Sequence, residues 1–188
     1  LSLTFEHQTA RLDVQVKVDH ADYDENNKLY YKYFIKSVTI ETGSKNRETL
    51  HVGLTGNPSW VSDANDEDLT YNISSFPEGI GDPDPEIGTV AAFQAATSTL
   101  NNTSESRIFP DSKHLTILPP TKTINTISVN YVEYVIHETT AAAWDNPAEY
   151  EFTSRTKKSK EITNISLTDS DNIVGGHRYT LNIELDPS

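Results

Sequence analysis

The sequence contains no cysteine in its 188 residues. The chain can therefore form neither disulfides nor thiolate metal sites, and it offers no cysteine nucleophile. No apolar run approaches the roughly 20 residues that a membrane-spanning helix needs. Basic residues are also scarce, since 15 Lys and Arg stand against 28 Asp and Glu for a net charge of −13. This excess of acid repels phosphates and anionic lipids, so we expect no nucleic-acid partner.

Catalytic motifs are equally sparse. The six histidines are scattered without H-x-x-x-H or HExxH spacing, and there is no G-x-S-x-G elbow, P-loop or G-x-G-x-x-G. No paired carboxylates or nucleophile arrangement stands out, which makes a β-sandwich hydrolase the least favoured class. We therefore predict that the protein is not an enzyme and that it has no cofactor, no metal site and no catalytic residue.

Two acidic loops are the best candidates for a calcium site. Hard oxygen ligands suit calcium, but neither loop has the glycine and glutamate at the positions that the EF-hand pattern requires. We interpret both loops as solvated connections and keep calcium binding at the first as the weaker alternative. The first loop contains Asp19, Asp22, Asp24, Glu25 and Asn26, and the second contains Asp63, Asp66, Glu67 and Asp68.

Strand patterns recur along the chain, and helical periodicity is almost absent. Apolar and polar residues alternate from Ala10 to Val18 with the period of two of a half-buried strand. Residues 29–42 are rich in aromatic and β-branched side chains, as strands are. Apolar alternation in residues 127–136 changes parity between Tyr131 and Val132, which suggests a sheet with bulges. Only residues 89–100 fit a short helix, and they fit an edge strand nearly as well.

The fold expected from this pattern is all-β. Roughly eight to ten short strands separated by turn signals are typical of an antiparallel Greek-key β-sandwich. We expect at most one short helix, and residues 1–188 are of a length that favours a single domain. The final strand places Tyr179, Leu181, Ile183 and Leu185 on one face, so we expect it to close the core of its own sheet.

Both tryptophans, Trp60 and Trp144, stand next to turn segments. An exposed aromatic ring at such a position can stack on a sugar ring, whereas a buried one packs against the rim of the core. Buried packing is the more common arrangement, so we favour it and keep sugar stacking as the alternative.

The opening stretch, LTFEHQTARLDVQVKV, contains one irregularity. Phe5 and His7 have the opposite parity to the apolar residues that begin at Ala10. Either a bulge or bend near Gln8 and Thr9 changes the parity, or the two residues cover a second apolar surface.

Three stretches, in this order, resemble the fimbrillin-like proteins of Bacteroidales, which include the Mfa-like group. The opening stretch resembles that family's L-x-F-x-H-x-x-A-[RK]-[LV]-x-V-x-V strand. LTILPPTKTINTISVNY resembles a strand that ends in a Pro-Gln pair, with Pro120 in place of the glutamine. IVGGHRYTLNIELDPS resembles the closing strand of the family. The matching positions include Phe5, His7, Ala10 and Arg11 in the first stretch and Gly176, Tyr179, Ile183 and Leu185 in the last.

The resemblance implies a transthyretin-like β-sandwich that forms the C-terminal domain of a two-domain subunit, whose N-terminal domain is absent here. It also implies that Phe5 and His7 have a role in packing and strand geometry. The protein would be a structural or adhesive subunit of a fimbria at the cell surface, associated with the outer membrane. Its partners would be other fimbrial subunits, joined by strand exchange, and surface glycans or proteins of a host or of bacteria.

The alternative function is a surface carbohydrate-binding β-sandwich module. An exposed aromatic platform would favour this alternative, and a vacant or mobile edge strand would favour the fimbrial subunit.

Overall fold

The computed structural model of the protein describes residues 9–45, 48–51, 59–62, 67–110, 113–117, 123–166 and 175–187. Within these residues the chain forms eleven strands and one short helix, so the predicted all-β class is confirmed. Phe5 and His7 lie outside the described residues, and with them the irregularity of the opening stretch. The elements are β1 Ala10–Val18, β2 Tyr23–Asp24, β3 Leu29–Lys45, β4 Glu48–His51, β5 Ser59–Ser62, β6 Asp68–Ile73, α1 Val90–Ala95, β7 Ser106–Arg107, β8 Leu115–Ile117, β9 Thr123–Thr140, β10 Glu149–Ser166 and β11 Arg178–Leu185.

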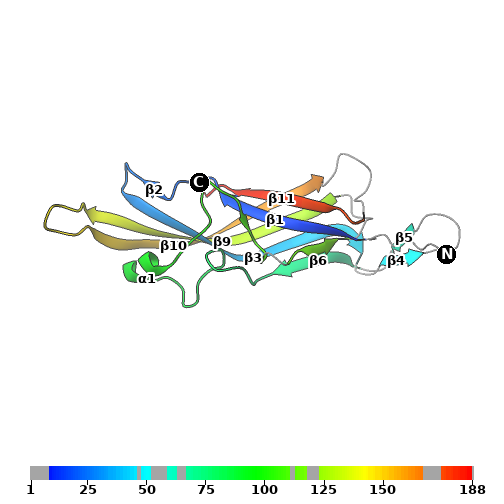
Figure 1. Ribbon diagram of the computed structural model, residues 1–188. Coiled ribbons are helices and arrows are strands. Elements are labelled where there is room, and N and C mark those ends of the chain that lie inside the picture. The colour runs from blue at the N-terminus through cyan, green and yellow to red at the C-terminus, as the bar shows by residue number, and fades with distance from the viewer. Residues whose placement is uncertain are drawn as a thin grey trace, which may run out of the picture.

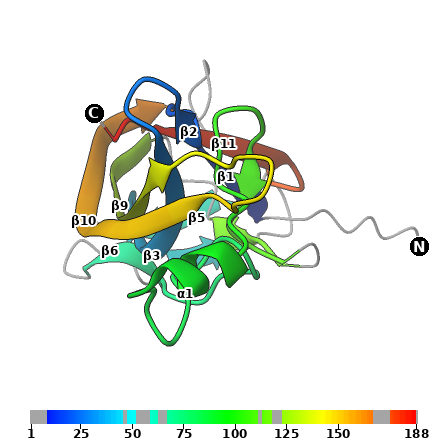
Figure 2. The same ribbon diagram turned by 90° about the vertical axis from the view of Figure 1, so that its left-hand side faces the viewer.

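Two sheets form a sandwich, seen along its length in Figure 1 and from one end in Figure 2. The first sheet has the order β11–β1–β7, with β8 also paired to β1, and the second has the order β10–β9–β3–β2, with β6 also paired to β3. Strands β4 and β5 form a separate antiparallel pair. Among the described strands the pairing is antiparallel except between β1 and β11, which run parallel. The first and last strands of the described chain are therefore neighbours.

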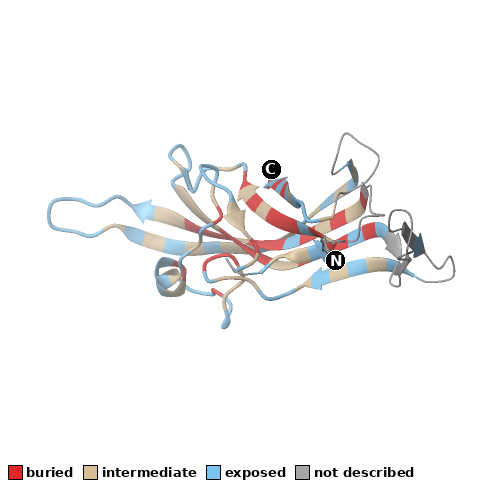
Figure 3. Ribbon diagram, turned by 45° about the vertical axis from the view of Figure 1, so that its right-hand side comes forward, coloured by how far each residue is buried: buried red, intermediate tan, exposed pale blue. Residues whose placement is uncertain are grey.

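The main core lies between the two sheets. Alternating residues of β1 and β11 point inward, and Figure 3 shows the resulting bands of buried positions along the strands. Leu181, Ile183 and Leu185 are buried in this core and Tyr179 is half-buried, which confirms that β11 closes its own sheet. The opposing wall comes from β3 and β9, through Tyr33, Ile35, Val38, Ile40, Ile124, Ile127, Val129 and Tyr131.

A second core lies on the other face of the second sheet. Val132, Tyr134 and Ile136 of β9 pack there with Phe34 of β3 and Phe93 of α1. The two cores explain the change of parity in β9. Up to Tyr131 the apolar residues of the strand face the main core, and from Val132 they face the second core on the opposite side of the sheet. Pairing of β9 with both neighbours is continuous at Tyr131 and Val132, so no bulge lies at that point.

Bulges do occur elsewhere in the second sheet. The register of β3 against β9 shifts between Ile35 and Ser37, so that Lys36 is the extra residue. The register of β10 against β9 shifts in the same way between Phe152 and Ser154. A bulge bends its strand and re-aims the side chain of the extra residue.

The helix α1 covers part of the second core and settles the choice left open for residues 89–100. Thr89 caps its first turn, since the side-chain oxygen accepts a hydrogen bond from the backbone nitrogen of Ala92 at 3.2 Å. At the other end, the ammonium of Lys32 donates to the carbonyl oxygens of Phe93 and Ala96. No helix in the described part of the chain is long and apolar enough to cross a membrane.

Candidate functional site

The second sheet extends beyond the first at the end that carries the β9–β10 hairpin, on the left of Figure 1. The hairpin closes in a tight turn, in which Ala143 N donates to Asn146 O at 3.0 Å and Asn146 N donates to Ala143 O at 3.3 Å. Trp144 and Asp145 are the two central residues of this turn. We call residues 143–146 the hairpin tip.

Trp144 is the most exposed large apolar side chain among the described residues. Its exposed fraction is 102%, compared with 49% for Val61 and 38% for Tyr23. Its neighbours in the hairpin are small or exposed, as the pale blue loop in Figure 3 shows. A tryptophan contributes nothing to the core from this position, but it offers a large area for contact with a partner.

A row of three tyrosines crosses the same end of the sheet. The rings of Tyr23 and Tyr30, which are paired across β2 and β3, have centroids 4.4 Å apart, and those of Tyr30 and Tyr150 are 5.7 Å apart. The hydroxyl of Tyr30 donates to Glu138 Oε2 at 3.0 Å. Burial and the nearby Glu138 carboxylate raise the pKa of Tyr30, so its hydroxyl stays protonated at neutral pH. These ring contacts link β2, β3 and β10 at the end of the sheet from which the hairpin extends.

The end of the sheet around this row is acidic. Among the described residues, the cations at this end are Lys28 and Lys32, and Lys32 is held by the carbonyl oxygens at the end of α1. The carboxylates outnumber these cations, which disfavours an anionic ligand. They belong to Asp22, Asp24, Glu25, Glu138, Asp145, Glu149 and Glu151.

The first acidic loop of the sequence lies at this end, between β1 and β3. Asp24 Oδ1 accepts hydrogen bonds from the backbone nitrogens of Asn26 and Asn27, and Oδ2 accepts one from Asn27 Nδ2 at 2.7 Å. These hydrogen bonds hold the pKa of Asp24 below its usual value, and the one from the Asn27 side chain has the largest effect. Asp24 therefore stabilises the turn. Within the described residues, no three His, Asp or Glu side chains converge as metal ligands, and Asp63 and Asp66 of the second loop lie outside those residues.

Calcium is expected to leave the thermal stability of the protein unchanged at low micromolar concentration. The reason is that both oxygens of Asp24 are already engaged in the turn, and weak extracellular sites bind only at roughly millimolar calcium. Thermal unfolding with and without calcium, with EDTA as the reference, measures this. A midpoint several degrees higher in 10 µM calcium (roughly the range of sensor sites) would contradict the prediction.

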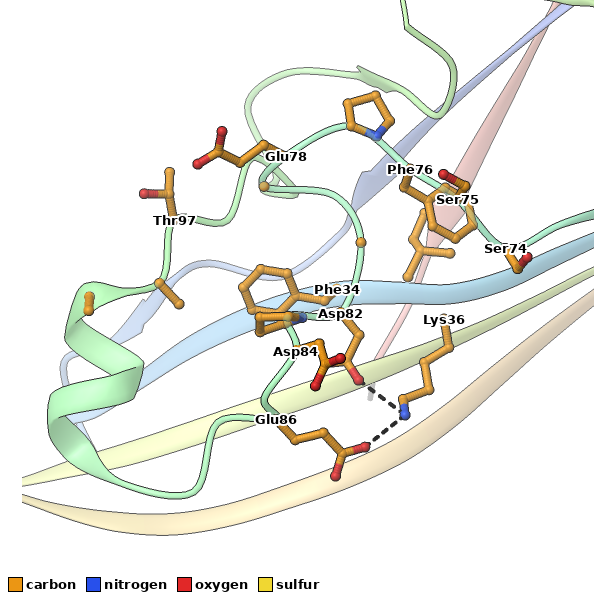
Figure 4. A pocket seen from close by; sticks show the side chains of 17 residues that line it. Phe34, Lys36, Ser74, Ser75, Phe76, Glu78, Asp82, Asp84, Glu86 and Thr97 are labelled. Carbon is orange, nitrogen blue, oxygen red and sulfur yellow. Dashed lines mark hydrogen bonds and ion pairs between the residues drawn. The ribbon is translucent and has the colours of Figure 1, made fainter.

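An open cleft of about 740 Å³ lies between β3, the loop at residues 74–86 and the end of α1. Figure 4 shows Lys36 at its wall, with Nζ 3.1 Å from Asp82 Oδ2 and 2.9 Å from Glu86 Oε1. The hydroxyl of Tyr134 donates to Asp82 Oδ1 at 2.6 Å, and Arg155 pairs with Glu86.

This ion-pair network anchors the loop to the sheet. Lys36 is the extra residue of the β3 bulge, and the backbone next to it bonds the loop through Asp82 N to Ile35 O at 3.0 Å. Hydrogen bonds to Glu86 and Asp82 raise the pKa of Lys36, so its ammonium stays charged and is a poor base or nucleophile. Asp82 and Glu86 are engaged by cations, which fits a structural role better than acid–base chemistry.

Where the structure describes the residues singled out in the first and last motifs, they lie in β1, in β11 or in the turn before β11. Ala10 is buried in the main core, and Arg11 is exposed while its backbone nitrogen bonds His177 O at 2.9 Å. Gly176 has a positive φ of 78°, which favours glycine, and its nitrogen bonds Thr9 O at 2.8 Å. These contacts join the start of β1 to the turn before β11. The candidate surface lies elsewhere, at the hairpin tip.

Burial at the rim of the core, which the sequence favoured for Trp144, is wrong, because the ring lies exposed in the turn of the hairpin. The tyrosine row was missed because only long-range strand pairing brings Tyr150 to Tyr23 and Tyr30. Of Trp60, only its backbone in β5 is described.

Comparison of the chain with protein-family models, with curated protein sequences and with solved structures gave no match. The resemblance to the fimbrillin-like proteins therefore rests on the three sequence motifs alone.

Proposed function

We propose that this chain is a non-catalytic, adhesive subunit of a bacterial cell-surface fimbria and that it contacts its target through the hairpin tip. The observation that carries the adhesive role is the full exposure of Trp144 in a tight turn at the far end of a long hairpin. The three sequence motifs supply the fimbrial context. The cleft beside Lys36 supports the non-catalytic part, because Asp82 and Glu86 are engaged in ion pairs there.

Assembly with other subunits by strand exchange would need a donor strand and an acceptor edge. Strand β11 is paired with β1 from Arg178 to Leu185 and buries its apolar face. We therefore expect the donor to be a segment other than β11. The edge strand β10 carries Arg155, Lys157, Lys158 and Lys160, and cations on an edge strand discourage indiscriminate pairing.

Substitution Trp144→Ala is expected to abolish most attachment of the protein to its target cells. The ring supplies the largest apolar area of the hairpin tip, and truncation of such an anchor typically costs about 2 kcal/mol or more of binding free energy. Attachment of protein-coated beads to cells, counted at equal coating density, measures the loss. Because the ring is fully exposed, the free energy of unfolding should change by less than about 0.5 kcal/mol.

Val61→Ala is the matched control, because Val61 is an exposed apolar residue in β5 at the opposite end of the molecule (Figure 1). It should leave attachment unchanged. Equal attachment of Trp144→Ala and unsubstituted beads would contradict adhesion through the hairpin tip.

The fimbrial part of the proposal has its own test. Antibodies raised against the purified chain should label filaments on cells that produce the protein, observed by immunogold electron microscopy. Label confined to the cell body would contradict a fimbrial subunit and favour a surface module.

A further inference from the structure

Three side chains of different chemistry follow one another in the hairpin tip. Trp144 offers a bare aromatic ring, and Asp145 and Asn146 are both exposed next to it. Asn146 Nδ2 donates to Asp145 Oδ1 at 3.4 Å, so the amide and the carboxylate lie side by side. The pair combines acceptor oxygens with an N–H donor beside an apolar surface.

A saccharide has the matching combination of surfaces. The C–H face of a pyranose ring is apolar and packs against an aromatic ring, while its edge carries hydroxyl groups that both donate and accept hydrogen bonds. Two hydroxyls on adjacent carbons can bond a carboxylate and a neighbouring amide together. Small-molecule sites combine an apolar surface with a few polar groups in this way.

The carboxylate of Asp145 makes an apolar pocket on a partner protein an unfavourable binding site for the hairpin tip. Burying Trp144 in such a pocket would also take Asp145 out of water, and an unpaired buried carboxylate is costly. A saccharide hydroxyl would instead donate to that carboxylate and replace the lost water. A glycan is thus the ligand that can both pack against Trp144 and hydrogen-bond to Asp145.

The surrounding charge narrows the class of glycan. Glu138, Glu149 and Glu151 lie on the two strands of the hairpin, and the end of β2 and the turn after it add Asp24 and Glu25. This field repels sialylated, sulfated and phosphorylated sugars as well as anionic lipid headgroups.

We infer that the hairpin tip binds a neutral saccharide with vicinal hydroxyls, by stacking on Trp144 and hydrogen bonding to Asp145 and Asn146. This ligand class rests on the adhesive function proposed above.

Affinity electrophoresis in native gels tests the ligand class. The gels contain mannan, galactan or β-glucan as neutral probes and heparin as the anionic probe. We expect at least one neutral polysaccharide to retard the protein, whereas heparin should not. Periodate treatment of that polysaccharide should remove the effect, because periodate cleaves the bond between carbons that carry vicinal hydroxyls.

The variants identify the site. Trp144→Ala should weaken binding by about tenfold or more, Trp144→Phe should retain part of the affinity, and Val61→Ala should bind as the unsubstituted protein does. Retardation by none of the neutral polysaccharides, equal retardation of Trp144→Ala, or binding that survives periodate would each overturn the inference.

The cell assay separates this inference from the function on which it rests. If Trp144→Ala abolishes attachment but the unsubstituted protein still attaches to periodate-treated cells, the ligand is not a glycan and the adhesive function stands. If Trp144→Ala loses polysaccharide binding but attaches to cells normally, the hairpin tip binds sugar without being the adhesive contact.

Discussion

A chain that ends at Gly176 is expected to aggregate or to remain unfolded. The truncation removes β11, whose Leu181, Ile183 and Leu185 are buried in the main core. Each such side chain contributes roughly 1.5–3 kcal/mol when fully buried, and the whole domain is expected to be stable by only about 5–15 kcal/mol. Removal of β11 also exposes the edge of β1, which pairs with β11 along the whole length of β11. An exposed apolar edge promotes aggregation.

Size-exclusion chromatography, together with urea unfolding followed by far-UV circular dichroism, measures this outcome. Two point variants in β11 show how much of the effect comes from the buried side chains, because they leave the length of the strand unchanged. Ile183→Ala opens a cavity in the core and should cost about 2–5 kcal/mol, whereas Asn182→Ala, on the exposed face, should change stability by less than about 0.5 kcal/mol. A truncated chain that is monomeric and unfolds cooperatively would show that β11 is dispensable, as a free donor strand would be.

The periodicity of apolar residues was sufficient to predict the strands of the main core. Alternation in β1 and β11 marks the face toward the main core directly, because the apolar side chains of both strands lie on that face. The alternation of β9 was harder to interpret, since this strand buries opposite faces in succession. A change of parity can arise from a bulge or from a second core, and the local sequence is the same in both cases.

The parts of the site that escaped prediction depend on long-range pairing. Tyr23 and Tyr30 pair across the short turn between β2 and β3, but Tyr150 reaches them only because β10 and β3 pair with opposite edges of β9, and no local pattern encodes that register. The parallel pairing of β1 and β11 is another example, because it joins segments about as far apart as the chain allows. Trp144 stands out in the sequence because it lies beside a turn, but its full exposure was not predicted, since a tryptophan in such a position more often packs against the core.

The other large effect is expected at Asp13, the one carboxylate buried in the first sheet within the described residues. Its side chain is 2% exposed, although it points away from the main core. Arg107 of β7 donates to Asp13 Oδ1 at 2.8 Å, and Arg178 of β11 pairs with Oδ2. Asp13 therefore ties the central strand of this sheet to both of its neighbours.

Asp13→Asn is expected to lower the free energy of unfolding by about 2 kcal/mol. Breaking a fully buried ion pair costs roughly 3–5 kcal/mol, because the remaining charge stays out of water. The effect should be smaller here, since the side chains of Arg107 and Arg178 are 24% and 62% exposed and can be hydrated. Urea unfolding at pH 7 measures the difference. Lys17→Ala is the matched control, because its pair with Glu184 also joins β1 to β11 but lies at the surface, so its loss should lower stability far less than Asp13→Asn does.

The cost of Asp13→Asn should depend on pH. Burial raises the pKa of Asp13, but hydrogen bonds and charges from Arg107 and Arg178 outweigh burial and hold the pKa below the ordinary value of an aspartate. A carboxyl whose pKa is lower in the folded state stabilises the protein above its unfolded pKa, and this contribution is lost as the pH falls through the folded pKa. The difference in unfolding free energy between the two proteins should therefore be constant above about pH 5 and shrink below about pH 4.

Other carboxylates titrate in both proteins and cancel in this difference. A gap that stays constant down to pH 2.5, or that widens with acid, would contradict an ionised Asp13 at the centre of the sheet.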